Sequence, residues 1–149
     1  MRLRRLLAAF ALALLPGFVL ATVFFVTTVW ASSYATLTVD TLADGAGDCN
    51  TSGSCTLRAA IAAAASGDTI TFAPALAGGT ITLTGSQLTI DKSLTISSSV
   101  AITVSGGRTV RVFDVTIGAV TFDGLSIVDG EPELDGTADG AGIRVRENA

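Results

Sequence analysis

The chain has 149 residues, of which 49% are hydrophobic, and a formal net charge of −4, so it can form a single domain with a modest core. It contains no histidine, which excludes Ser-His-Asp triads and histidine-ligated zinc sites. Its 9 Lys and Arg residues form no basic stripe and are outnumbered by 13 Asp and Glu residues, so no nucleic-acid partner is expected.

Residues 1–35 have the pattern of an export signal. A positively charged start, residues 2–5, precedes an apolar stretch over residues 6–29. Small residues at suitable spacing allow a signal peptidase to cut after Ala31 or after Ala35. Cleavage is the favoured interpretation, and an uncleaved membrane anchor is the alternative because about 20 apolar residues span a bilayer. In both cases the rest of the chain is expected outside the cell or at its surface, with membrane contact only through this segment.

Cys49 and Cys55 enclose the polar loop 50–54 and are the only cysteines in the chain. Oxidising compartments favour disulfides, and two cysteines alone cannot build a tetrahedral metal site. A local Cys49–Cys55 disulfide is therefore predicted, with two free thiols as the alternative. Its short loop places its stabilisation at the lower end of about 2–4 kcal/mol.

Residues 36–68 read as a strand, a loop and a short helix. Apolar residues alternate with Thr and Asp over 36–42, which predicts a half-buried strand, and the Gly, Asp, Asn and Ser residues of 43–54 predict a loop. Ser54 or Thr56 can then cap a helix that ends at Gly67. The apolar face of this helix is small and regularly spaced, and we expect it to cover the open end of a β-structure. That face consists of Leu57, Ala60, Ile61 and Ala64.

Strand signals dominate after Gly67, with Thr alternating with Ile, Leu, Val or Phe. Apolar pairs such as Ile81 with Ile102, and Phe122 with Ile143, recur at about 20–21 positions, which is typical of stacked solenoid coils. The alternative is a β-sandwich of hairpins, for which Asp123-Gly124 is the one good turn candidate. The predicted strands cover 69–72, 80–84, 88–90, 94–96, 101–104, 109–115, 119–122, 125–128 and 143–145.

Two motifs resemble the CSLREA domain of exported bacterial right-handed parallel β-helix proteins. The motifs are Cys55-Thr56-Leu57-Arg58-Ala59-Ala60-Ile61 and Gly67-Asp68-Thr69-Ile70-Thr71-Phe72. The resemblance covers roughly residues 36–145. It departs from the family pattern at Thr56, which replaces Ser, and at Ala59, which replaces Glu. Because that Glu would be a partner for Arg58, a buried Arg58 is expected to pair with Asp68 instead, and the alternative is an exposed Arg58 on the solvent side of the helix.

The resemblance implies an all-β fold of the pectin lyase-like type, a single-stranded right-handed parallel β-helix with a short N-terminal capping α-helix. The expected organisation is a signal peptide or anchor helix over 1–35, a cap over 36–68, and β-helix coils over 69–149 that are incomplete at the C-terminus. Solenoids need caps at both ends, and no second cap is evident in the sequence.

An acidic stretch near the end of the chain could offer oxygen ligands to calcium, the one cofactor considered. The favoured interpretation is a solvated acidic turn without metal, because Asp, Gly and Pro favour turns by themselves. The weak candidate ligands are Asp129, Glu131, Glu133 and Asp135, with Asp139 nearby.

The favoured function is a structural or adhesin-like β-helix protein, exported to the surface or secreted, with no catalysis and with a carbohydrate or cell-surface partner. The alternative is the N-terminal fragment of a carbohydrate-active enzyme, lyase or hydrolase, or a carbohydrate-binding module. Asp114, Asp123 and Arg111 could then share one outer face of the β-helix, where such enzymes place their acidic and basic groups. The sequence identifies neither the ligand nor the oligomeric state.

Overall fold

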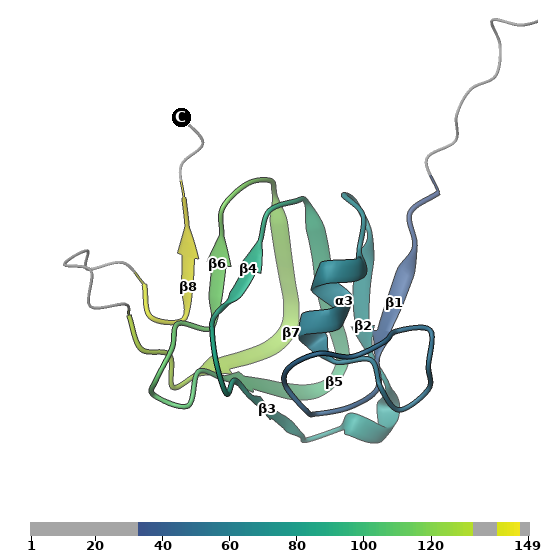
Figure 1. Ribbon diagram of the computed structural model, residues 1–149, viewed down its shortest axis with the longest axis horizontal. Helices are drawn as coiled ribbons and strands as arrows, with labels where there is room; N and C mark the ends of the chain where they lie inside the picture. Colours follow the sequence, from purple (N-terminus) through teal and green to yellow (C-terminus); the bar gives the residue numbers. More distant parts are fainter. Residues whose placement is uncertain (1–32, 133–139, 147–149) are drawn as a thin grey trace, which may run out of the picture. The chain divides into compact units, whose positions relative to one another are not determined.

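Parallel strands and one short helix make up the described part of the chain, residues 33–132 and 140–146 of the computed structural model (Figure 1). The elements in chain order are β1 (Thr36–Val39), α3 (Leu57–Ala63), β2 (Thr69–Phe72), the 3-10 helix η1 (Pro74–Leu76), β3 (Thr80–Thr82), β4 (Leu88–Ile90), β5 (Leu94–Ser105), β6 (Phe113–Val115), β7 (Val120–Val128) and β8 (Ile143–Val145).

Two parallel sheets form from these strands. In the first, β1, β2, β5 and β3 are neighbours in that order and β7 also pairs with β5. In the second, the order is β4, β6, β8, and these strands lie side by side in Figure 1. Because every described strand pair is parallel, the β-sandwich alternative is wrong. Asp123-Gly124 makes no hairpin and lies inside β7.

The predicted offset between stacked residues is wrong. Ile81 is aligned with Val104 rather than with Ile102, and Phe122 is aligned with Ile96. The true offsets are therefore longer than about 20–21 positions and differ between strands. The reason is that turns of unequal length, such as the one containing η1, separate the strands, and residue alternation within a strand carries no information about them.

β5 and β7 are each one bent strand where two were predicted. β5 includes the predicted strands 94–96 and 101–104, and β7 includes most of 119–122 and all of 125–128. The register between the two strands shifts after Ser97 and resumes at Ile102. Gly124 lies at this shift with a φ of 68°, and a Cβ there would collide with the Ser98 carbonyl. A glycine is thus required where two parallel strands bend together.

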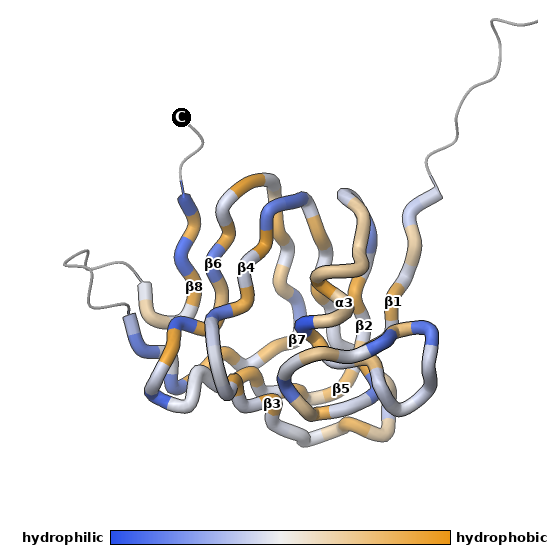
Figure 2. The backbone as a smooth tube through the Cα atoms, viewed as in Figure 1, coloured by the Kyte–Doolittle hydropathy of each residue, from blue (hydrophilic) through white to orange (hydrophobic). Residues whose placement is uncertain are grey.

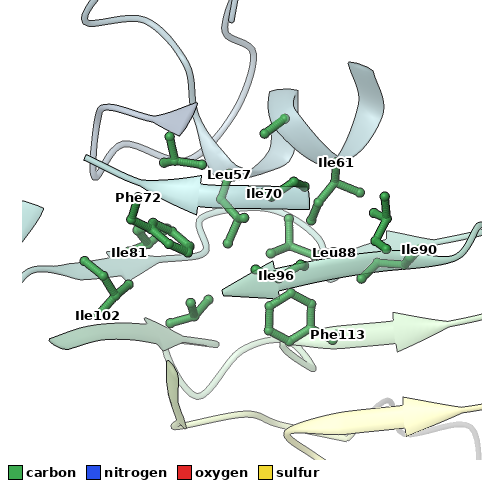
Figure 3. Close-up of a cluster of buried hydrophobic side chains, with 14 of the residues drawn as sticks. Leu57, Ile61, Ile70, Phe72, Ile81, Leu88, Ile90, Ile96, Ile102 and Phe113 are labelled. Atoms are coloured by element: carbon green, nitrogen blue, oxygen red, sulfur yellow. The ribbon is translucent and has the colours of Figure 1, made fainter. Parts of the chain in front are cut away.

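Alternate residues of the strands point into one apolar core, and Figure 2 shows the corresponding alternation of hydropathy. Phe113 and Phe122 approach with ring centroids 4.7 Å apart. The helix α3 packs against β1 and β4, and its Leu57 and Ile61 lie in the same cluster as Ile70 and Leu88 (Figure 3). The predicted apolar face of the helix is confirmed, since Leu57, Ala60, Ile61 and Ala64 are all buried.

Candidate functional site

The predicted Cys49–Cys55 disulfide is present and braces the loop before α3. Cys55 is only 1% exposed. The Asp40 carboxylate, at the end of β1, accepts the backbone N–H groups of Gly53 (2.6 Å) and Cys55 (2.8 Å). The disulfide and this carboxylate together hold the loop against the first strand.

Arg58 pairs with Asp44 and not with Asp68, so the predicted Arg58–Asp68 ion pair is wrong. Its Nε and Nη2 donate to the two Asp44 oxygens at 2.9 and 3.1 Å. The same guanidinium donates to the backbone carbonyls of Ser86 (2.7 Å) and Gln87 (3.2 Å). Arg58 therefore joins α3 to the loop after β1 and to the residues that enter β4.

Asp44 completes this junction. Its carboxylate, 3% exposed, also accepts the Thr84 backbone N–H at 2.9 Å. Burial alone would raise the pKa of Asp44, but the hydrogen bonds from Arg58 and Thr84 and the charge of Arg58 outweigh it and lower the pKa below its usual range. The group therefore remains a carboxylate that bonds to two other segments, α3 through Arg58 and the loop after β3 through Thr84.

Asp68 has a different task from the predicted one. It is 5% exposed, and its two oxygens accept the backbone N–H groups of Ala35 and Ala65, each at 2.8 Å. Asp68 thereby connects the residue before β1 to the C-terminal end of α3. These main-chain bonds leave it no role as the partner of Arg58.

The ends of α3 are also capped by side chains. The Thr56 hydroxyl accepts the Ala59 N–H at 3.0 Å, so Thr56 is the N-cap residue of α3. Lys92 donates to the carbonyls of Ile61 (3.4 Å) and Ala64 (3.2 Å), where a cation complements the helix dipole. No pattern in the sequence indicates that Lys92 caps α3, because Lys92 lies in a turn about 30 residues after the helix.

Asp114 forms a buried charge cluster on the second sheet. Its side chain is 2% exposed, and it accepts two hydrogen bonds from Arg144, both at 2.9 Å, and two from Arg146, at 3.2 and 2.8 Å. The hydrogen bonds from Arg144, opposed by burial and supported by Arg146, hold the pKa of Asp114 far below its usual range. Gln87 donates to the same carboxylate at 3.1 Å. Asp114 thus cannot carry a proton at neutral pH.

The predicted shared outer face of Asp114, Asp123 and Arg111 is wrong. Asp114 belongs to β6 in the second sheet, whereas Asp123 belongs to β7 in the first sheet and accepts from Ser97 Oγ at 3.2 Å. Arg111 is 1% exposed and donates to the Gly140 carbonyl at 2.9 Å. These three residues therefore do not form a site open to a substrate.

Two clefts lie beside β4 and share Ser86, Gln87 and Thr89 as a common wall. The larger, of about 430 Å³, extends to Arg58 and Lys92. The smaller, of about 290 Å³, is also lined by Thr109, Val110, Arg111 and Glu131. The larger cleft has polar and apolar walls in about equal share, with Ile61 and Leu88 among its lining, the smaller is mainly polar, and neither is lined by an aromatic ring. They are the candidate ligand-binding surface of this part of the chain.

Two of the candidate calcium ligands lie in the described residues and two do not. Asp129 accepts from Arg108 Nε at 3.1 Å, and the backbone N–H of Glu131 bonds to the Val110 carbonyl at 2.9 Å. Glu133 and Asp135, with Asp139, lie outside the described residues. Within residues 33–132 and 140–146, no group of three or more acidic or cysteine side chains is suited to hold a metal. The calcium site stays a prediction.

The predicted export signal lies mostly outside the described residues. Ala31 and the apolar stretch precede the described residues, whereas Ala35 is described and exposed. No helix in the described ranges has the length and apolar character needed to cross a membrane. No protein-family model, curated protein or solved structure matches the chain.

Proposed function

We propose that the chain is exported and forms the N-terminal cap and first coils of a right-handed parallel β-helix, which serves as a non-catalytic scaffold at the cell surface. The observation that carries this proposal is the parallel pairing of every described strand with its neighbour, with α3 packed on the same apolar core against β1 and β4. A helix that caps the first coil of a β-helix shields the apolar interior and the edge of the first sheet from pairing with other chains. The resemblance to CSLREA domains points the same way.

Export is supported by the disulfide, because such bonds persist in oxidising compartments. The charged start and apolar stretch of residues 1–35 support it independently.

The absence of catalysis is supported by how the charged groups are used. Paired-carboxylate sugar chemistry needs two carboxyl groups at a fixed separation, one of them able to hold a proton. Asp114 is held ionised by Arg144 and Arg146, and Asp123 lies on the other sheet. The cleft surface beside β4 favours carbohydrate binding as a second candidate function, through polar groups such as Gln87 and Thr89.

The test is expression of the full chain with a C-terminal tag in a bacterium, followed by fractionation and intact mass with and without reductant. We expect a product outside the cytoplasm that gains two hydrogens on reduction and lacks its N-terminal segment. A full-length, reduced chain in the cytoplasm would overturn export. An experimental structure of that product tests the fold, and a left-handed stack would overturn the β-helix assignment.

Carbohydrate binding is tested separately with immobilised pectin, alginate and cellulose. Retention that is lost in Thr89→Ala, while Ser126→Ala on the first sheet retains it, would support the second candidate. Absence of retention on all three polymers would contradict carbohydrate binding and leave the scaffold as the single proposed function.

A further inference from the structure

β1 is an edge strand of the first sheet, and half of its main-chain groups face away from β2 (Figure 1). The Ala35 carbonyl accepts the Thr69 N–H at 2.9 Å, so Ala35 and every second residue after it turn their main chain toward β2. Main-chain groups of successive strand residues point to opposite edges. The N–H and carbonyl groups of Thr36 and Thr38 therefore point to the edge that no described strand occupies.

The loop before α3 covers only the last part of this edge. The Asp40 N–H, the next outward-facing donor after Thr38, donates to the Cys55 carbonyl at 3.1 Å. Before that point, Thr36 and Thr38 are both exposed. A strand edge with free donors and acceptors is a template on which another extended chain can pair.

A groove of about 810 Å³ lies along this free edge. One of its walls is β1, and the other is formed by the disulfide loop and by the side of α3 that carries Ala59 and Ala63. These small side chains leave room for a strand beside β1, and the half-buried Leu37 offers it an apolar contact. The volume is within the range of about 300–1,000 Å³ that is usual for binding sites.

The charged side chains that line the groove are all acidic. They are Asp40 directly after β1, Asp48 beside the disulfide, and Asp68, and no Lys or Arg is among the described residues that line it. Hydrogen bonds from the Asn50 backbone N–H and from the Thr51 and Asn50 side chains lower the pKa of Asp48, so this exposed group is ionised at neutral pH. The groove therefore favours a positively charged occupant.

We infer that β1 binds an extended, lysine- or arginine-bearing segment of another protein, which adds as a strand to the edge at Thr36 and Thr38 and lies against α3 and the disulfide loop. Main-chain hydrogen bonds provide the affinity, and the carboxylates select positive charge. A second copy of this chain fits less well, because its own β1 edge brings the same carboxylates. The interaction needs only the folded region around β1 and α3, so it goes beyond the proposed scaffold role and does not rest on it.

The test uses the folded product of the full chain and measures binding by NMR titration, with hydrogen exchange at the Thr36 and Thr38 amides as the readout of strand addition. The probe is a synthetic peptide with the sequence Lys-Thr-Val-Thr-Val-Lys. One control peptide has glutamate at both ends, and another has N-methylated main-chain amides, which cannot donate to a strand edge. We expect the lysine peptide to slow exchange at both amides, and each control peptide to bind at least about fivefold more weakly.

Two variants locate the site. Thr38→Pro removes one outward N–H and keeps the main-chain bonds of β1 to β2, so it should bind the peptide at least about fivefold more weakly while the protein stays folded. Asp48→Asn should weaken binding by roughly two- to threefold, an effect that added salt reduces. Its matched control, Asp91→Asn, removes the same charge outside the groove and should leave the affinity unchanged.

Several outcomes would overturn the inference, whether or not Thr38→Pro folds. The first is no binding of the lysine peptide at millimolar concentration, and the second is equal binding of either control peptide. The third is slow exchange at Thr36 and Thr38 in the free protein, because the edge would then already be occupied. Protection that rises with protein concentration in the absence of peptide would identify a second copy as the occupant and reject the basic partner.

Discussion

Replacing Asp44 by alanine should loosen the cap more than any other single change in the loop after β1. The substitution removes two hydrogen bonds to Arg58 and one to the Thr84 N–H, from a carboxylate that is 3% exposed. Breaking a fully buried ion pair from one side costs about 3–5 kcal/mol. Arg58 is 27% exposed and keeps the Ser86 and Gln87 carbonyls, so we expect a loss at or just below the bottom of that range, about 2–3 kcal/mol.

Thermal unfolding followed by circular dichroism measures this loss. At roughly 4 °C per kcal/mol for a domain of this size, the midpoint should fall by about 8–12 °C. The matched control is Asp91→Ala, which removes a carboxylate that is 66% exposed and 3.6 Å from Lys92, and it should cost less than about 0.5 kcal/mol. If the unfolding midpoint of Asp44→Ala falls no further than that of Asp91→Ala, the hydrogen bonds of the buried Asp44 do not stabilise the contact between α3 and the loop after β1.

A double-mutant cycle separates the ion pair from the other contacts of each residue. Arg58→Ala combined with Asp44→Ala should show a coupling of about 1–2 kcal/mol, because the two side chains share two hydrogen bonds. The cycle of Arg58→Ala with Asp68→Ala should show a coupling below about 0.5 kcal/mol. A larger coupling between Arg58 and Asp68 than between Arg58 and Asp44 would contradict the structure and support the ion pair predicted from the sequence.

Three further changes test other parts of the structure. Because the pKa of Asp114 is lower in the folded than in the unfolded chain, its stabilisation is present above the unfolded value near ~4 and is lost as the pH falls below it, so urea midpoints should drop in acid and drop less in Asp114→Asn. Cys49→Ser with Cys55→Ser should lower the unfolding free energy by about 2 kcal/mol, and an unchanged urea midpoint would contradict a bracing role. Gly124→Ala should cost more than about 1 kcal/mol, whereas Gly85→Ala, where a Cβ meets nothing within 4 Å, should be close to neutral in the same titration.

The strands and the helix face were predictable because their signals are local. Alternation places Ile70 and Phe72 inward whatever the rest of the chain does, and the spacing of Leu57, Ala60 and Ile61 defines one helical face. The stacking offset was not predictable, since it depends on turns whose lengths have no periodic signal. Thr109–Val115 illustrates the limit. Its first residues look strand-like, but Gly107 and Arg108 adopt positive φ angles and delay the strand until Phe113.

The partner of Arg58 was missed for a related reason. Asp68 is close to the helix in sequence, but the end of α3 and the start of β1 present N–H groups that no strand can satisfy, and Asp68 accepts two of them. Asp44 lies in a loop without any pattern and reaches Arg58 only when the loop folds back.

Several carboxylates in the described part of this acidic chain brace turns. Asp40, Asp44 and Asp68 each accept backbone N–H groups at the places where the chain leaves a strand or helix, and Asp114 aligns β8 with β6 through Arg144. A carboxylate can accept several hydrogen bonds at once, so a single side chain replaces the sheet partner that a turn lacks. Groups committed in this way cannot also move protons for a reaction. Charged side chains that stay exposed, such as Asp91 and Arg108, are not committed in this way, and the clefts beside β4 combine charged groups such as Lys92 with neutral polar ones.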